Sequence, residues 1–171
     1  MRYVILMRGV NVGGVTVKMA DLRDLLTGLG YDDVKTVLAS GNALATTTAS
    51  GAEVKSAVEG ALKARFGYDA IVHVLTADAL RAAFDGYPFA RGRDGWHDYA
   101  LFVSDAAVQQ AILDLDLDAE HEQAAAGDGV IYWTVPKGDT LDSELGKAIG
   151  RASYRPYVTS RNLNTLEKLL G

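Results

Sequence analysis

The sequence predicts an α+β protein built from antiparallel sheets, each with its helices packed on one face. Two observations indicate this class. Apolar runs of strand length alternate with segments whose apolar residues recur at helical spacing, and the first six segments run strand, helix, strand, strand, helix, strand. This is the split βαβ order of ferredoxin-like folds. A looser copy of the same order follows in the second half, so we expect two subdomains of ferredoxin-like character.

The expected domain boundaries follow from this repeat and from the length of 171 residues, which suits one domain or two small subdomains. We expect a ferredoxin-like subdomain over residues 1–76 and a connecting helix with a linker over residues 77–95. A second α+β subdomain with a C-terminal helix should cover residues 96–171. The segment Arg91 to Gly95 has the most linker-like composition.

The elements of the first half are predicted from periodicity and from helix-end signals. We expect strands over residues 3–7, 34–38, 43–47 and 70–75, the middle two joined by a turn at residues 40–42. A helix from Met19 should stop at Gly30. A second helix should begin at a capping box formed by Ser50 and Glu53 and end at Gly67.

The second half gives weaker signals of the same kind. Thr76 should cap the connecting helix, and Ser104 should cap a helix that follows a strand over residues 99–103. A hairpin is expected over residues 122–135. A helix through Leu141, Leu145 and Ile149 should then lead to an irregular stretch and a last amphipathic helix ending at Leu170.

Composition excludes several classes of function. The net charge of −5 and the pI near 5.1 argue against a nucleic-acid partner, because backbone phosphates are bound by clustered Lys and Arg. Cysteine is absent, which excludes disulfides and thiolate chemistry. No apolar run has the length of a membrane span, and no metal-ligand spacing is present. We therefore expect a soluble cytoplasmic protein without cofactor or metal.

The clearest candidate for a site is the loop after the first strand, where a guanidinium, amides and glycines cluster. Arg8, Asn11, the backbone N–H groups of Gly13 and Gly14, and Lys18 could hold an anion ahead of a helix N-terminus. The spacing fits neither a P-loop nor the dinucleotide fingerprint. The alternative is a strand-to-helix turn that needs positive φ at its glycines.

Two further motifs are candidates for the same site. Ser40, Gly41 and Asn42 form either a hairpin turn or a polar wall beside the glycine loop. Arg161 and Asn162 either cap the last helix or bring the basic stretch Lys147 to Arg161 close to the loop. We expect Arg161 and Asn162 to lie near residues 8–14.

These motifs together carry a resemblance to a known family. The stretches Leu6 to Gly14, Lys18 to Arg23, Ser40 to Asn42 and Arg161 to Thr165 resemble domain-of-unknown-function family 1697 over nearly the whole chain. The resemblance implies two α+β subdomains similar to the ferredoxin-like fold. It supplies no catalytic residues, and the family has no assigned activity.

The main functional hypothesis is the binding of an anionic or phosphorylated small molecule at the glycine-rich loop. One alternative is a protein-interaction module without catalytic activity, with self-association left open. Another is an acylphosphatase-like hydrolase, by fold analogy, in which Arg8 and Asn42 handle a phosphoryl group. RNA binding is disfavoured, because the strand from Ala43 to Thr47 has no stacking aromatic residue. Whether the protein is an enzyme is left open.

Overall fold

The computed structural model describes residues 1–11 and 15–171 and divides the chain into two compact units. The first unit comprises Met1–Arg81 with Glu167–Gly171, and the second comprises Ala82–Leu166. The division falls within helix α3 (Ala77–Asp85) and within helix α6 (Leu163–Leu170). The domain boundaries expected from the sequence stay a prediction.

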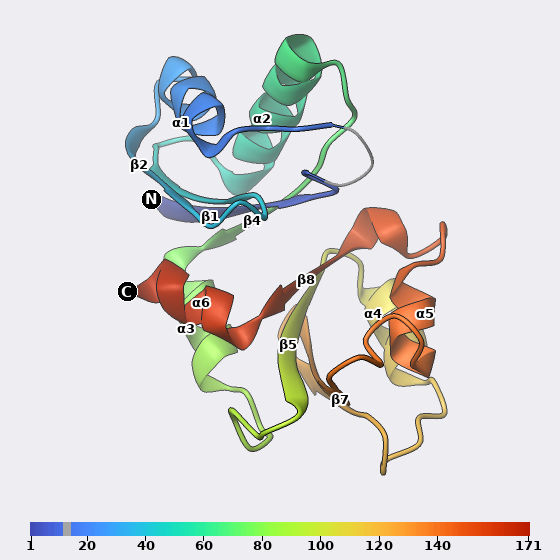
Figure 1. Ribbon diagram of the computed structural model, residues 1–171. Coiled ribbons are helices and arrows are strands. Elements are labelled where there is room, and N and C mark those ends of the chain that lie inside the picture. The colour runs from blue at the N-terminus through green and yellow to red at the C-terminus, as the bar shows by residue number, and fades with distance from the viewer. Residues whose placement is uncertain (12–14) are drawn as a thin grey trace. The chain divides into compact units, whose positions relative to one another are not determined.

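The first unit has the predicted order of strands and helices (Figure 1). Its elements are β1 (Arg2–Arg8), α1 (Met19–Gly28), β2 (Asp32–Val37), β3 (Asn42–Thr46), α2 (Gly51–Phe66) and β4 (Ile71–Thr76). Among the described residues, four strands form one sheet in the order β2-β3-β1-β4, and every neighbouring pair is antiparallel. The α+β class with antiparallel sheets is therefore confirmed.

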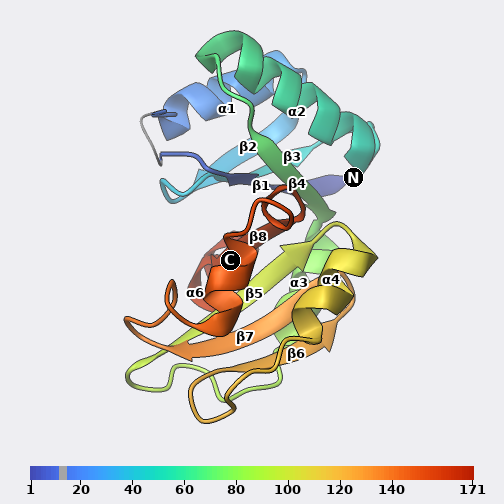
Figure 2. The ribbon, with the colours of Figure 1, turned by 90° about the vertical axis from the view of Figure 1, so that its right-hand side faces the viewer.

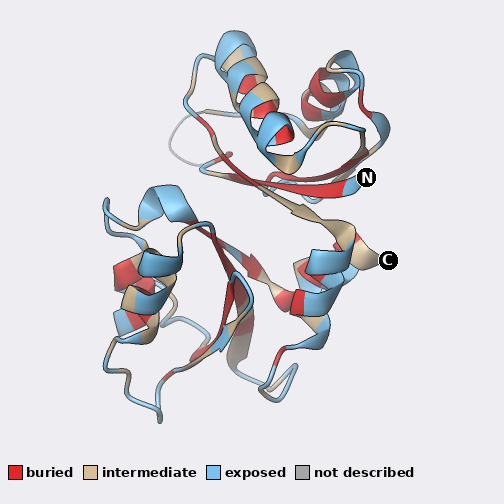
Figure 3. Cartoon of the chain, turned by 180° about the vertical axis from the view of Figure 1, so that it is seen from behind, coloured by how far each residue is buried: buried red, intermediate tan, exposed pale blue. Residues whose placement is uncertain are grey.

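The core of the first unit lies between one face of this sheet and the helices α1 and α2. Alternate residues of β1, namely Tyr3, Ile5 and Met7, belong to one buried apolar cluster with residues of both helices. Leu22 and Leu62 contribute from α1 and α2. Figure 3 shows the buried stripe on the helices, as expected when apolar residues recur at helical spacing.

Helix α2 begins and ends as its sequence predicts. The Ser50 hydroxyl accepts a bond from the backbone N–H of Glu53, and the Glu53 carboxylate accepts from the backbone N–H of Ser50 at 2.7 Å. Gly67 ends the helix in the left-handed conformation, with φ of 69°. The capping box therefore fixes where the chain enters this helix.

The second unit repeats this architecture (Figure 2). Its elements are β5 (Trp96–Val103), α4 (Ala106–Leu113), β6 (Gln123–Gly127), β7 (Val130–Pro136), α5 (Glu144–Ile149), the 3-10 turn η1 (Arg155–Tyr157) and β8 (Val158–Asn162). The sheet order is β6-β7-β5-β8, again antiparallel throughout. Leu101 and Trp133 pack with Ile112 of α4 and Leu145 of α5 in a core of its own.

The register of the two sheets agrees where each inner strand meets the end of its edge strand. In each unit a tyrosine of the inner strand, Tyr3 or Tyr99, lies opposite the last residue of the edge strand, Thr76 or Asn162. A helix follows directly, α3 after β4 and α6 after β8. The units differ in their connections, because residues 9–18 join β1 to α1 whereas two residues join β5 to α4.

Four predictions about single elements were wrong. The stretch expected to be irregular contains strand β8. Asp105, and not Ser104, caps α4, because its side chain accepts from the backbone N–H of Val108 at 2.9 Å. Helix α5 begins at Glu144, so that Leu141 precedes it and is 81% exposed. Asn42, which was placed in a turn, begins strand β3.

The described residues also bear on membrane insertion. None of the helices they form has the length and hydrophobicity needed to cross a bilayer.

Candidate functional site

The loop after β1 and the turn between β2 and β3 lie side by side at one end of the first sheet. The backbone N–H of Met7 donates to the carbonyl of Gly41 at 2.8 Å. In the loop that follows β1, the side-chain amide of Asn11 donates to the carbonyl of Ala39 at 2.6 Å. We call residues 8–11, 15–18 and 38–42 together the loop edge. Two motifs that are far apart in the sequence therefore share this edge.

Asn11 holds its loop in shape. Its amide nitrogen also donates to the carbonyl of Val17 at 3.3 Å, and its side-chain oxygen accepts from the backbone N–H of Val17 at 2.8 Å. The backbone at Asn11 is left-handed, with φ of 59°, a conformation that asparagine tolerates better than most residues. Both N–H groups of its side chain are thus engaged, and a bond from Asn11 to an anion would require one of them to open.

The turn between β2 and β3 depends on close backbone packing and on one buried amide. A Cβ atom at Gly41 would lie 3.1 Å from the Cβ of Met7, and the backbone there is left-handed with φ of 82°. Asn42 is fully buried, and its amide donates to the carbonyl of Val37 at 2.9 Å and to the hydroxyl of Ser40 at 2.8 Å. Ser40 to Asn42 therefore stabilise the hairpin, whatever else they bind.

Two cationic residues flank the loop. Arg8 is the last residue of β1 and is half-buried. Lys18 is exposed and directly precedes α1, in extended backbone and without a side-chain cap bond. The positive end of the α1 dipole therefore lies next to Lys18. Gly13 and Gly14 lie outside the described residues, so their expected contacts stay predictions.

Arg161 and Asn162 belong to the second unit. Arg161 is buried in β8, where its guanidinium donates to the hydroxyl of Thr159 and to the carbonyl of Ser160, both at 2.8 Å. The side-chain oxygen of Asn162 accepts from the backbone N–H of Asn164 at 2.9 Å, at the start of α6. Asn162 therefore caps this helix, and its expected proximity to Arg8 stays a prediction.

Sequence reasoning missed a buried polar cluster around Asp98. The Asp98 carboxylate accepts from the hydroxyl of Tyr87 at 2.7 Å and from the backbone N–H of Gly92 at 2.8 Å. Burial, followed by the bond to Asp98, raises the pKa of the Tyr87 phenol well above its usual range. The segment expected to be a linker is therefore anchored to the sheet. The sequence offered one signal for this cluster. Asp98 lies within a largely apolar strand, and a buried carboxylate requires hydrogen-bond partners.

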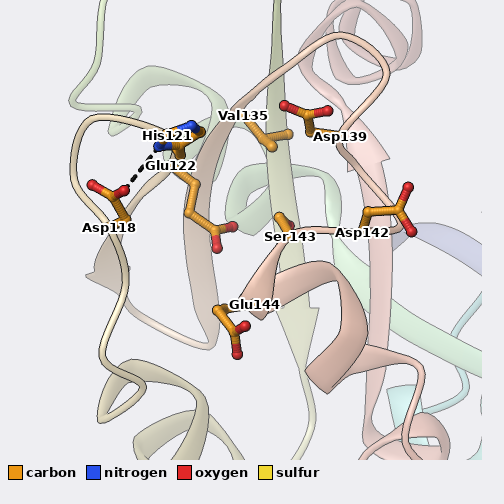
Figure 4. A pocket seen from close by; sticks show the side chains of 8 residues that line it. All are labelled: Asp118, His121, Glu122, Val135, Asp139, Asp142, Ser143 and Glu144. Carbon is orange, nitrogen blue, oxygen red and sulfur yellow. Dashed lines mark hydrogen bonds and ion pairs between the residues drawn. The ribbon is translucent and has the colours of Figure 1, made fainter.

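An acidic pocket of about 390 Å³ lies elsewhere in the second unit (Figure 4). It is lined by Asp118, His121, Glu122, Val135, Asp139, Asp142, Ser143 and Glu144. Glu122 is buried and accepts from the indole N–H of Trp133 at 2.9 Å and from the backbone N–H of Leu145 at 3.2 Å. Its carboxylate thus fixes the start of α5. No grouping suited to a metal ion occurs among the described His, Asp and Glu side chains.

Comparison with known families decides the classification. The family model described as "Protein of unknown function (DUF1697)" matches residues 1–132, which is more than half of the chain. The chain belongs to this family. The match covers the loop edge of this DUF1697 protein, whereas Arg161 and Asn162 lie beyond it. No curated protein matches the sequence.

A solved structure similar to this DUF1697 protein supports the same fold. The conserved bacterial protein SP0830 from Streptococcus pneumoniae is 27% identical, with a TM-score of 0.80 over 98% of this chain and 96% of that chain. An unknown protein from Galdieria sulphuraria is 14% identical over 94% of this chain and 96% of that chain, with a TM-score of only 0.28. The similarity to the streptococcal protein extends over both units.

Proposed function

We propose that the protein binds a small molecule carrying a phosphate or carboxylate group at the loop edge. The observation that carries this proposal is the gathering of left-handed backbone in two hydrogen-bonded loops. Gly9, Asn11, Leu38 and Gly41 all have positive φ, between 58° and 82°. For a bulky residue such as Leu38 this conformation costs on the order of 1–3 kcal/mol, and such strain clusters where ligands bind.

The chemistry of the loop edge suits an anion. Arg8 and Lys18 lie at its two ends, and the α1 N-terminus presents backbone N–H groups next to Lys18. A guanidinium can contact a phosphate or carboxylate through two parallel bonds, and each charge-assisted bond contributes about 1.5–3 kcal/mol. The net charge of −5 opposes long polyanions, so a single small anion is the better match.

The cytoplasm is the compartment we propose for this function. A sequence without cysteine suits a reducing environment, where disulfides are rare.

Isothermal titration with inorganic phosphate and a panel of phosphorylated and carboxylated metabolites tests the proposal. We expect Arg8→Ala and Lys18→Ala each to weaken binding by about tenfold or more, the loss of one charge-assisted bond. Arg23→Ala is the matched control, because Arg23 is an exposed arginine of α1 in the same unit. Equal affinities for the wild type and both variants would refute the proposal, as would the absence of any binding.

A further inference from the structure

A second polar cavity, of about 330 Å³, lies entirely within the second unit. It forms where the edge strand of the sheet ends. β8 pairs only with Tyr99 to Val103 of β5, so Trp96 to Asp98 extend past the end of β8. Helix α6 begins at that point and turns the chain away. The cavity occupies this uncovered stretch, with the loop around Arg93 on one side.

The groups that line the cavity are held in place by contacts of their own. The Arg93 guanidinium lies 4.0 Å from the centre of the Trp96 ring and donates to the hydroxyl of Thr134 at 3.0 Å. The bond from Gly92 to Asp98 fixes the loop that carries Arg93. Among the described residues, the buried Nε atom of Arg93 has no hydrogen-bond partner. The loop is therefore ordered around a guanidinium with unused hydrogen-bonding capacity.

The charges that line the cavity are balanced. Arg93 and Lys137 supply two positive charges, and Asp94 and Asp98 supply two negative charges. Both Asp98 oxygens already accept hydrogen bonds, whereas Asp94 is exposed. The two carboxylates would repel a polyphosphate, and the positive charges of Arg93 and Lys137 would repel a simple cation. A ligand with one charge of each sign can meet Arg93 and Lys137 with its anionic group and the exposed carboxylate of Asp94 with its cationic group.

We propose that this cavity binds a small zwitterion, an amino acid or dipeptide, whose carboxylate contacts Arg93 and Lys137. Its ammonium group faces Asp94, and the amides of Asn162 and Asn164 bind its polar backbone atoms. The volume lies at the lower end of the range for ligand pockets, as a ligand of this size requires. The residues that line this cavity all belong to the second unit, and either proposal can fail without the other.

A thermal-shift screen of the twenty amino acids and glycylglycine on the full chain, followed by isothermal titration, tests this inference. Each ligand that binds is compared with the amine that lacks its carboxylate and with the acid that lacks its ammonium group. We expect either loss to weaken binding by about tenfold or more. A ligand that binds as well without one of its charges would overturn the assignment, as would a screen without any binding.

Substitutions then locate the site. Lys137→Ala and Asp94→Asn remove one charge each from exposed side chains and should each weaken zwitterion binding by about tenfold. Two control variants, Lys147→Ala and Asp128→Asn, make the same changes at exposed positions that do not line the cavity. They should bind the zwitterion with the affinity of the wild type. Wild-type affinity in Lys137→Ala and Asp94→Asn would contradict the proposal.

Discussion

Single polar side chains determine much of the local structure, and Asn11 is the clearest case. It is exposed, yet its side chain bonds to the backbone of Val17 on its own loop and of Ala39 on the neighbouring turn. Asp98 has the same role in the second unit, where its carboxylate holds Tyr87 and Gly92. In both units one polar side chain helps to order a neighbouring segment through hydrogen bonds.

Asn11→Ala should lower the free energy of unfolding by about 2–3 kcal/mol, because three hydrogen bonds are lost and a left-handed position acquires a residue that disfavours it. Asn11→Gly is the matched variant, since it accepts the positive φ but makes none of the side-chain bonds, and it should be less destabilised. Urea denaturation measures both. A loss below about 0.5 kcal/mol in Asn11→Ala would show that the bonds to Val17 and Ala39 contribute little.

Tyr87 makes stability fall at alkaline pH. Because burial raises its pKa, the folded state holds the phenol proton more tightly than the unfolded chain does. This contribution is complete below the unfolded pKa of about 10 and is lost as pH rises towards the folded value, at up to about 1.4 kcal/mol per pH unit. Tyr87→Phe should make the decline above pH 10 shallower by that amount in urea denaturation. An unchanged slope would contradict the assignment.

At the scale of elements, capping residues and apolar periodicity correctly predicted those helices and strands that are long or buried on one side. Helix α2 shows this, since Ser50, Glu53 and Gly67 mark its ends and Val54, Val58 and Leu62 form its buried stripe. Hydrogen bonds from Ser50, its backbone N–H first, lower the pKa of the Glu53 carboxyl. The stabilisation from this ionised cap should be present at neutral pH and be lost as pH falls through the lowered value.

Ser50→Ala should cost about 1 kcal/mol of unfolding free energy and bring the pKa of Glu53 back towards its usual value. Ser56→Ala is the control, because Ser56 is exposed within the same helix, where alanine favours helix formation slightly. Thermal denaturation of the two variants at neutral pH makes the comparison. Equal stabilities would mean that the capping box does not stabilise α2.

Strand β8 shows why some elements could not be predicted. Its sequence, Val158 to Asn162, has only one apolar residue, so it lacks the alternation that reveals a half-buried strand. Among the described strands it pairs with β5, at the edge of the sheet, and its buried members include Thr159 and Arg161. Residues 158–162 form a strand because they pair with β5, about sixty residues earlier in the chain. A pattern of neighbouring residues cannot predict such long-range pairing.

The two candidate sites were also predictable to different extents, because one is marked by a local sequence pattern and the other depends on strand pairing. The segment Ser40 to Asn42 and the loop between Arg8 and Lys18 stand out in the sequence, because both contain glycine and asparagine, which are typical of turns. The cavity beside Arg93 depends on where β8 ends along β5. This position is set by the register of the two strands, which the sequence alone does not reveal. Residues 91–95 were therefore interpreted as a linker, although Gly92 bonds to Asp98 and Arg93 packs on Trp96.

The whole molecule consists of two units with the same order of elements and a core of their own. Their differences lie in connections, the loop from Gly9 to Lys18 in the first unit and the segment before β5 in the second. Loops carried by a rigid sheet are where binding residues concentrate. Each unit therefore combines the common sheet with one added loop, and each added loop provides one of the proposed sites.

Ile5→Ala and Leu101→Ala test whether the units open independently. The two residues are fully buried and occupy equivalent positions on β1 and β5. Each substitution should cost about 2–5 kcal/mol. In native-state hydrogen exchange, we expect Ile5→Ala to accelerate exchange mainly in residues 1–81 and Leu101→Ala mainly in residues 82–166. Equal acceleration of both units by either substitution would show one cooperative structure.

The most direct test of the central claim, anion binding at the loop edge, is a nuclear magnetic resonance titration of the ¹⁵N-labelled protein with inorganic phosphate. We predict saturable amide shifts at Gly9 to Asn11, Val15 to Lys18 and Leu38 to Asn42 that share one dissociation constant. The same shifts should be absent or much weaker in Arg8→Ala, while Arg23→Ala retains them. Unchanged amides at the loop edge at millimolar phosphate, or shifts confined to residues 82–166, would contradict the account.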